Sequence, residues 1–311
     1  MSANILGLHH VTAIAGNAKR NYDFYTKVLG LRLVKKTVNF DDPGTYHFYY
    51  GNQAGEPGTI ITFFPWEGIR RGASGTGQAT STSFSIPKDS IPFWLKRFQD
   101  YEVNYNNPSS RFDEKVVTFL DPDGLKLELV SHTSLDERKS WITSEISTDQ
   151  AIRGFYNVTL TLEGYERTAN LLIDLFGYEI KDEHINRFRF VNNKNENANI
   201  MDLVCLPSGK RGTVAGGSVH HIAFRVKDEA EQLQVREKLI EMGYNVTPQL
   251  DRSYFKSVYF REPGGVLFEI ATDPPGFTAD EDINSLGEEL KLPSWLEPRR
   301  EEIENVLPEL S

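Results

Sequence analysis

The hydrophobic and polar positions of this chain repeat one order of elements four times. Each repeat opens with an apolar run typical of a buried strand, continues with a segment of helical periodicity and closes with further strands. The opening strands are expected at 8–14, 80–86, 155–160 and from 219, and the closing strands at 59–64, 125–130, 200–204 and 266–271. We interpret this order as four βαβββ units.

Similarity between individual positions supports the repeat. Three of the expected helices end at a glycine that leads into the next strand: Gly30, Gly177 and Gly243. Aligning the opening strands places four polar residues at one position: His10, Ser81, Asn157 and His221. Aligning the closing strands places four more at another: Thr62, Glu128, Asp202 and Glu269.

The repeat divides the chain into modules and a tail. We expect modules one to four to span 1–71, 78–132, 151–208 and 216–277, with linkers at 72–77 and 131–150. Residues 278–311 form an acidic C-terminal tail interrupted by prolines, and the sequence predicts a short helix at 299–306. The expected fold class is α+β.

Composition narrows the class of protein. The 311 residues are 39% hydrophobic and 25% charged, as expected of a globular chain with a sizeable core. A formal net charge of −10 argues against nucleic acid or an anionic membrane surface as the main partner. Cys205 is the one cysteine, so no intrachain disulfide can form, and the sequence shows neither a signal peptide nor a membrane-spanning apolar run. These features predict a cytoplasmic protein.

The candidate chemistry lies on the strands of modules one and four. His10 and His221 each follow another histidine in an apolar strand, and Glu269 interrupts the apolar run 266–271. Two imidazoles and one carboxylate on one face of a metal leave coordination positions open, as in non-haem Fe(II) enzymes that use oxygen. Modules two and three offer no histidine at the aligned position. The sequence therefore predicts one metal site, with His10, His221 and Glu269 as ligands, shared by modules one and four.

Each candidate ligand has a structural alternative. A histidine in a strand is often a hydrogen-bonded core residue. An unpaired buried carboxylate is costly, which favours a ligand role for Glu269, but Glu128 lies in the same kind of strand and could simply pair with a basic residue. The coincidence of all three repeat positions favours the metal site.

Several motifs resemble the vicinal-oxygen-chelate (glyoxalase and extradiol dioxygenase) superfamily, and within it the hydroquinone ring-cleaving dioxygenases. The motifs are Leu8-His9-His10-Val11-Thr12, Gly30-Leu31-Arg32-Leu33-Val34-Lys35-Lys36-Thr37, Tyr49-Tyr50-Gly51, Glu56-Pro57-Gly58-Thr59 and 292–300 of the tail. The resemblance covers nearly the whole chain and is most specific in its N-terminal third. From this resemblance we expect the modules to form two open barrel-like sheets.

The resemblance also implies residue roles and reactants. The second histidine of each pair is the ligand, and Arg252, Tyr259 and His9 are the candidate catalytic residues around the metal. The expected cofactor is Fe(II), although the ligand types also allow Mn(II). The expected partners are a small aromatic substrate and O2, with no nucleic acid or membrane partner, and a homo-oligomer is compatible with the family.

The sequence leaves three points open. Tyr259 lies opposite Glu269 if the 262–265 hairpin has a three-residue loop, whereas Val258 does if the loop has two residues. Strand alternation predicts that His9 points away from His10. For function, the alternatives are a metal-dependent isomerase or thiol transferase of the glyoxalase type, which consumes no O2, and a non-catalytic ligand-binding protein of the same fold.

Overall fold

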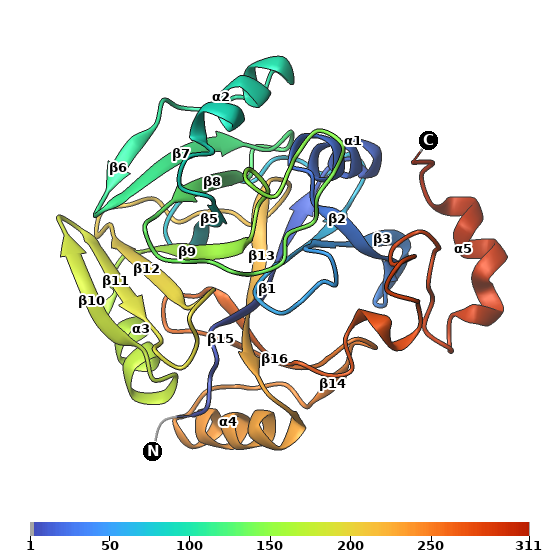
Figure 1. The fold of residues 1–311 in the computed structure, drawn as a ribbon. Helices are drawn as coiled ribbons and strands as arrows, with labels where there is room; N and C mark the ends of the chain where they lie inside the picture. Colours follow the sequence, from blue (N-terminus) through green and yellow to red (C-terminus); the bar gives the residue numbers. More distant parts are fainter. Residues whose placement is uncertain (1–2, 311) are drawn as a thin grey trace.

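Two eight-stranded sheets make up the protein, for which a computed structural model describes residues 3–310 (Figure 1). The first sheet has the order β14-β15-β16-β13-β1-β4-β3-β2 and the second the order β10-β11-β12-β9-β5-β8-β7-β6. The strands of the first sheet are β1 (Leu8–Ala15), β2 (Arg32–Asn39), β3 (Asp42–Gly51), β4 (Ile60–Pro65), β13 (Ser218–Val226), β14 (Leu250–Asp251), β15 (Lys256–Arg261) and β16 (Leu267–Thr272). Those of the second are β5 (Gln78–Ile86), β6 (Ser109–Arg111), β7 (Glu114–Leu120), β8 (Lys126–Ser131), β9 (Gly154–Leu162), β10 (Glu179–His184), β11 (Arg187–Val191) and β12 (Ile200–Cys205).

The helices are few and short. They are α1 (Ala18–Asp23), α2 (Ile91–Asp100), α3 (Glu166–Asn170), α4 (Glu229–Glu241) and α5 (Arg300–Val306), with π-helical turns η1 (Phe24–Val28) and η2 (Leu171–Leu175) and 3-10 turns η3 (Phe277–Ala279) and η4 (Glu297–Arg299). The two curled sheets confirm the expected α+β fold class with open barrel-like sheets. The short helix predicted near the end of the tail is α5.

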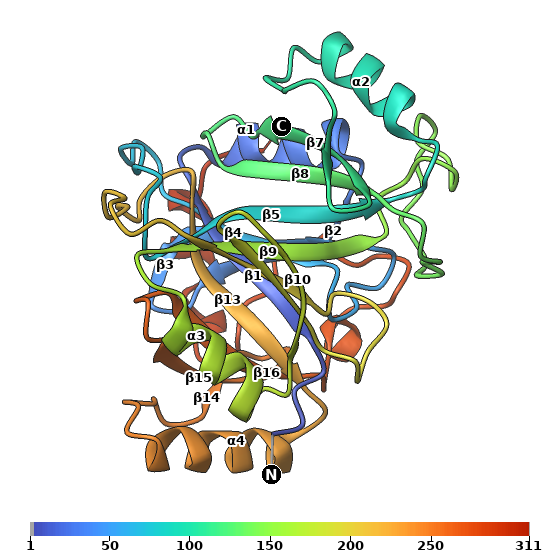
Figure 2. The same ribbon diagram turned by 90° about the vertical axis from the view of Figure 1, so that its left-hand side faces the viewer.

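The first sheet joins the two ends of the chain. Strand β1 pairs with β13 in antiparallel register, so residues 8–65 and 218–272 share one sheet. In the same way β5 pairs with β9 in the second sheet, whose strands run across β1 and β13 in Figure 2. One large apolar cluster runs through both sheets, with Phe84 and Phe224 among its fully buried members. The division at the module boundaries given above stays a prediction.

Four β-bulges occur at matching places in the strands that join each sheet. In the first sheet the extra residues are His9 on β1 and His220 on β13, each directly before a predicted ligand. In the second sheet they are Thr80 on β5 and Tyr156 on β9. Each bulge thus precedes one of the four residues that the sequence alignment placed at one position. The parallel pairings Thr12↔Thr62, Ser83↔Glu128, Thr159↔Asp202 and Ala223↔Glu269 then give the closing strands the same register in all four places.

Some element boundaries differ from the prediction. The sequence predicts strands at 31–34 and 46–50, but β2 and β3 extend to the tight turn at 40–41 because they pair with one another along their length. Conversely, the sequence predicts a strand at 254–260, but Tyr254 and Phe255 precede β15. Within residues 3–310 we find no helix long and apolar enough to cross a membrane. The cytoplasmic location and the homo-oligomer stay predictions.

Candidate metal centre

The side chains of His10, His221 and Glu269 meet between three neighbouring strands, β1, β13 and β16. The Nε2 atoms of the two histidines lie 3.2 Å apart. Glu269 Oε2 lies 3.3 Å from His10 Nε2 and 2.9 Å from His221 Nε2. All three residues are buried. Among residues 3–310, they are the one group of three or more His, Cys, Asp or Glu side chains placed to share a metal ion.

The spacing of these three atoms fits a metal ion. A six-coordinate ion with ligands at roughly 2.1 Å holds neighbouring ligand atoms about 3.0 Å apart. Glu269 is fully buried, and its Oε2 atom has no hydrogen-bond partner among the described residues. A buried carboxylate oxygen without a hydrogen bond is costly unless a cation satisfies it. The other oxygen, Oε1, accepts a 2.5 Å hydrogen bond from Ser257 on β15, which turns Oε2 toward the histidines.

The bulges at His9 and His220 place a second imidazole behind each candidate ligand. His9 Nδ1 lies 3.0 Å from His10 Nδ1, and His220 Nδ1 lies 2.8 Å from His221 Nδ1. The prediction that His9 points away from His10 is therefore wrong, because the bulge interrupts the alternation of the strand. If His10 and His221 carry their proton on Nδ1 and donate it to these neighbours, both Nε2 lone pairs face the centre, as metal binding requires.

Burial favours neutral imidazoles here. It lowers the pKa of His221, and burial together with His10 lowers that of His9 well below its ordinary value. Burial and the neighbouring His221 lower the pKa of His220 to about 4. Burial opposes ionisation of Glu269, but the adjacent His10 and His221 outweigh it and hold the pKa of the carboxyl well below its ordinary value. The low pKa keeps Glu269 ionised, and a metal ion would bind these groups by displacing any proton that the imidazole nitrogens carry.

A cavity of about 240 Å³ opens onto the centre. Its walls are largely aromatic, and one arginine and one aspartate lie at its mouth. The lining residues are His10, Thr12, Asn39, Phe40, Asp41, His47, Phe64, Trp66, His220, His221, Arg252, Phe255, Tyr259 and Leu267. His9 is absent from this set, so it can orient His10 but does not face the cavity.

Tyr259 and Arg252 lie together beside the centre. Tyr259 is directly opposite Glu269 in the β15–β16 register, which settles the register question in favour of the three-residue loop. Its ring packs edge-on against His221 at 5.5 Å between centroids, and burial, with the Glu269 charge, raises the pKa of its hydroxyl. The Arg252 guanidinium lies 5.5 Å from the centre of the Tyr259 ring and 3.7 Å from Asp41.

The sequence reading missed His47, which lines the cavity from β3. Its Nε2 lies 2.8 Å from Thr62 Oγ1 and its Nδ1 lies 2.9 Å from the Tyr49 hydroxyl. Tyr49 pairs with Thr62 as Tyr259 pairs with Glu269. Extending the repeat alignment to this third strand would have found His47, because it takes the place that Ser257 has beside Glu269.

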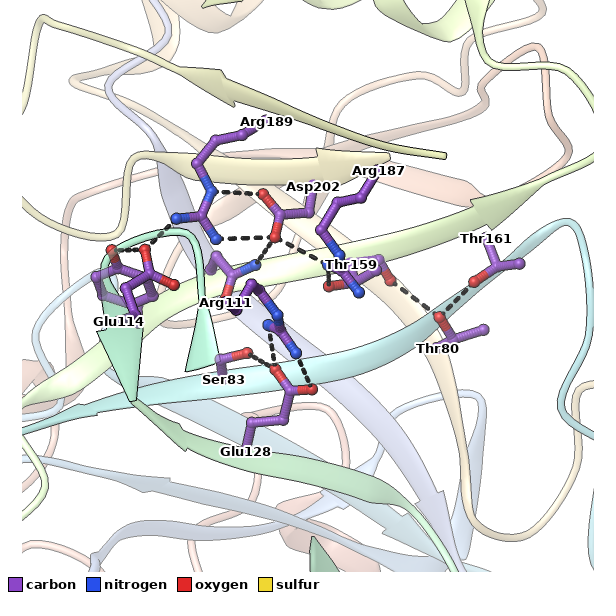
Figure 3. Close-up of polar contacts among 12 residues, drawn as sticks. Thr80, Ser83, Arg111, Glu114, Glu128, Thr159, Thr161, Arg187, Arg189 and Asp202 are labelled. Atoms are coloured by element: carbon purple, nitrogen blue, oxygen red, sulfur yellow. Dashed lines mark hydrogen bonds and ion pairs between the residues drawn. The ribbon is translucent and has the colours of Figure 1, made fainter. Parts of the chain in front are cut away.

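The matching place in the second sheet holds arginines (Figure 3). Arg111 donates two 2.7 Å hydrogen bonds to Glu128, which also accepts one from Ser83. Asp202 accepts two hydrogen bonds from Arg189, at 2.8 and 2.9 Å, and one from Arg187 at 2.9 Å. Glu128 thus has a basic partner, the alternative that the sequence left open. Permanently charged guanidinium groups neutralise these buried carboxylates, where the first sheet has only imidazoles.

Comparison with known proteins places the chain in a family. The model of the glyoxalase/bleomycin resistance protein/dioxygenase superfamily matches residues 7–129 and 158–270. MhqO of Bacillus subtilis strain 168, named as a ring-cleaving dioxygenase, is 48% identical over 309 residues, 99% of this chain and 97% of that protein. The chlorohydroquinone/hydroquinone 1,2-dioxygenase of Sphingobium indicum is 33% identical over 306 residues, 96% of this chain and 94% of that protein.

A solved structure agrees with these matches. The crystal structure of a Bacillus subtilis protein described as a dioxygenase superposes with a TM-score of 0.95 at 46% identity, covering 100% of this chain and 99% of that one. The sequence matches and this structure span nearly the whole chain. The chain therefore belongs to the glyoxalase/bleomycin resistance protein/dioxygenase superfamily, and its similarity within it is to the ring-cleaving dioxygenases.

Proposed function

We propose that the protein is an Fe(II)-dependent dioxygenase that opens the ring of a hydroquinone-like aromatic, with His10, His221 and Glu269 as the metal ligands. The observation that carries this proposal is the buried Oε2 of Glu269, which accepts no well-aligned hydrogen bond and lies about 3 Å from two imidazole nitrogens at the end of an aromatic cavity. The name of the Sphingobium relative supports the hydroquinone class of substrate. When bound, the ion would offer open positions to both reactants and pass charge between them.

The cavity fits one substituted aromatic ring. A cavity of roughly 150 Å³ accommodates benzene in another protein, so 240 Å³ leaves room for ring hydroxyls, a small substituent and O2. Phe40, Phe64, Trp66 and Phe255 provide apolar walls that orient the ring and exclude water. Because Asp41 offsets the charge of Arg252, the mouth favours a ring without a carboxylate.

Residues beside the substrate ring would transfer protons and hold its oxygens. Tyr259 keeps its proton at neutral pH, because burial and Glu269 raise its pKa, so it can donate to an oxygen that becomes negative during the reaction. Arg252 can hold a substrate oxygen by a charge-assisted hydrogen bond. His9 acts through His10, whose ring it orients, and is a positioning residue.

Metal content and oxygen uptake test the proposal together. The protein is purified anaerobically, its iron is measured, and oxygen consumption is followed with a panel of hydroquinones and catechols, with Mn(II)-loaded protein in parallel. His221→Ala and Glu269→Gln are each expected to lose both iron and oxygen uptake, whereas the control His184→Ala, at an exposed position on β10, keeps both. Oxygen consumption with hydroquinone retained by the His221 or Glu269 variant would contradict the proposal.

The same measurements distinguish the two alternative functions, an isomerase or thiol transferase and a non-catalytic binding protein. A glyoxalase-type isomerase or thiol transferase would convert its substrate without consuming O2. A non-catalytic binding protein would contain no iron and would keep its affinity for the aromatic ring after His10→Ala.

A further inference from the structure

We propose that the C-terminal tail positions the aromatic wall of the cavity through contact between Trp295 and Phe40, and thereby sets the affinity for the ring substrate. The proposal rests on the proposed function, because it concerns the same cavity. It assigns a role to residues that lie outside both sheets and contribute none of the residues that line the cavity.

The tail attaches along the outer edge of the first sheet. Leu290 forms a parallel bridge with Lys36 of β2, and the Lys291 amide donates a 2.9 Å hydrogen bond to the Lys36 carbonyl. In Figure 1, α5 lies beyond β3 at the edge of the first sheet. Tail side chains form a separate apolar cluster with Val38: Leu292, Leu296, Ile303 and Leu307. The tail is therefore packed against the hairpin that β2 and β3 form.

A second attachment lies at the start of the tail. Lys35 of β2, whose side chain is fully buried, forms ion pairs with Asp280 at 2.5 Å and with Glu281. Asp280 also accepts a 3.0 Å hydrogen bond from the Tyr254 hydroxyl. Tyr254 immediately precedes Phe255, another aromatic wall of the cavity. Both attachments fix the path of the tail close to the mouth of the cavity.

Trp295 connects this tail to the cavity. Its ring packs edge-to-face against Phe40, with centroids 5.5 Å apart and an interplanar angle of 80°. Phe40 lies in the two-residue turn between β2 and β3 and lines the cavity. The Trp295 side chain is 56% exposed, although four other tail residues around it are buried in the apolar cluster. A large aromatic that buries so little area adds modestly to the core, so its main consequence is to support Phe40.

The Phe40 turn needs such support because it is the tip of a long hairpin. The Asp41 amide donates a 3.0 Å hydrogen bond to Asn39 Oδ1 within the turn, but the Asp41 side chain is 82% exposed and lies 3.7 Å from Arg252. Asp42 is held more firmly, by a 2.9 Å hydrogen bond from the Trp66 indole. Without Trp295 the Phe40 ring would be free to swing toward solvent, and the cavity would lose an apolar wall for part of the time.

Substitution of Trp295 tests the inference. An edge-to-face aromatic pair contributes enough to change an equilibrium constant about three- to tenfold. We expect Trp295→Ala to raise KM for a substituted hydroquinone, and its dissociation constant measured anaerobically by calorimetry, by that factor. Its kcat and iron content should match the unmodified protein, because no metal ligand or reacting group is touched.

A double variant and two controls separate positioning from stability. If Trp295 acts through Phe40, the double variant Trp295→Ala with Phe40→Ala binds the ring no more weakly than Phe40→Ala alone. Ile303→Ala removes a buried side chain from the same tail cluster, on α5 and eight residues from Trp295, and should lower Tm while leaving KM unchanged. Val306→Ala, at a 62% exposed position of α5, should change neither.

Three results would overturn the inference: an unchanged KM and dissociation constant in Trp295→Ala, independent effects of the two aromatic substitutions, or an equal rise of KM in Ile303→Ala. Failure of the proposed function looks different, because the unmodified protein would then consume no oxygen with any aromatic. In that case the calorimetric dissociation constant still decides whether Trp295 controls ring binding. If no ring compound binds at all, both the inference and the proposed function are refuted.

Discussion

Replacing Ser257 by alanine should weaken metal binding while the first sheet stays folded. Ser257 is fully buried on β15, and its hydroxyl donates a 2.5 Å hydrogen bond to Glu269 Oε1. This bond holds the carboxylate in the rotation that presents Oε2 to His10 and His221. Alanine removes the donor without adding volume, so the carboxylate loses its fixed orientation.

The size of the effect follows from burial. A buried acceptor that loses its hydrogen bond costs about 1–3 kcal/mol, with charged acceptors at the upper end. Glu269 is fully buried, so no water replaces the serine hydroxyl. Since 1.4 kcal/mol is a factor of ten, this range corresponds to a metal dissociation constant about five to 150 times larger. Loss of groups that orient metal ligands in other proteins weakens metal binding by about 10- to 100-fold. We therefore expect a tenfold to hundredfold loss.

The second sheet provides a matched control. Ser83 is also fully buried, and it donates a 2.7 Å hydrogen bond to Glu128, the buried carboxylate that corresponds to Glu269. The affinity for Fe(II) is measured anaerobically by competition with a chromophoric chelator, and stability by urea unfolding of the metal-free protein. Ser83→Ala should lower the free energy of unfolding about as much as Ser257→Ala but leave iron affinity unchanged.

Two results would refute this reasoning. Iron affinity of Ser257→Ala within a factor of two of the unmodified protein would mean that the orientation of Glu269 does not limit binding. Equal loss of iron affinity in both variants would mean that affinity follows general stability, and the assignment of Glu269 as a ligand would lose its support from Ser257.

Three further predictions concern charge and proton transfer. Burial opposes ionisation of Glu128, but the Arg111 guanidinium outweighs it and lowers the pKa of Glu128 from 4.5 to about 2. This pair should therefore add about 3 kcal/mol to the free energy of unfolding above pH 4.5, a contribution that is lost as the pH falls toward 2. In Arg111→Ala, acid unfolding followed by circular dichroism should begin at higher pH. Asp41→Asn should lower KM for a carboxylated hydroquinone about two- to fivefold relative to hydroquinone, because Arg252 loses its exposed partner; an unchanged ratio would contradict this role. Tyr259→Phe should lower kcat for oxygen uptake about hundredfold with iron content unchanged, and a loss confined to KM would assign the hydroxyl to binding alone.

The repeat was the part of the fold that the sequence could predict. Apolar periodicity and glycine positions located the elements, and the alignment placed His10, Ser81, Asn157 and His221 at positions that each follow a bulge in the structure. Local patterns carry no information about strand order. The pairing of β1 with β13, which brings His10 and His221 together, therefore had to be inferred from the chemistry of the ligands.

The surroundings of the centre could not be predicted for a different reason. Alternation assumes an uninterrupted strand, and the bulge at His9 invalidates it at the residue where the prediction was made. His47 was missed because its strand was not included in the alignment. Trp295 and Phe40 lie far apart in sequence, and neither belongs to a periodic pattern that would predict their contact.

The arginines of the second sheet show why one backbone arrangement gives two kinds of site. Both sheets bury carboxylates at the same register position, and a buried carboxylate needs a cation close to it. In the second sheet Arg111 and Arg189 keep their charge and supply that cation directly. In the first sheet the neighbours are His10 and His221, whose side chains, unlike a guanidinium group, can lose their charge to become metal ligands. If Glu269 binds a metal as proposed, the choice of histidine instead of arginine on the neighbouring strands is what suits the first sheet to that metal.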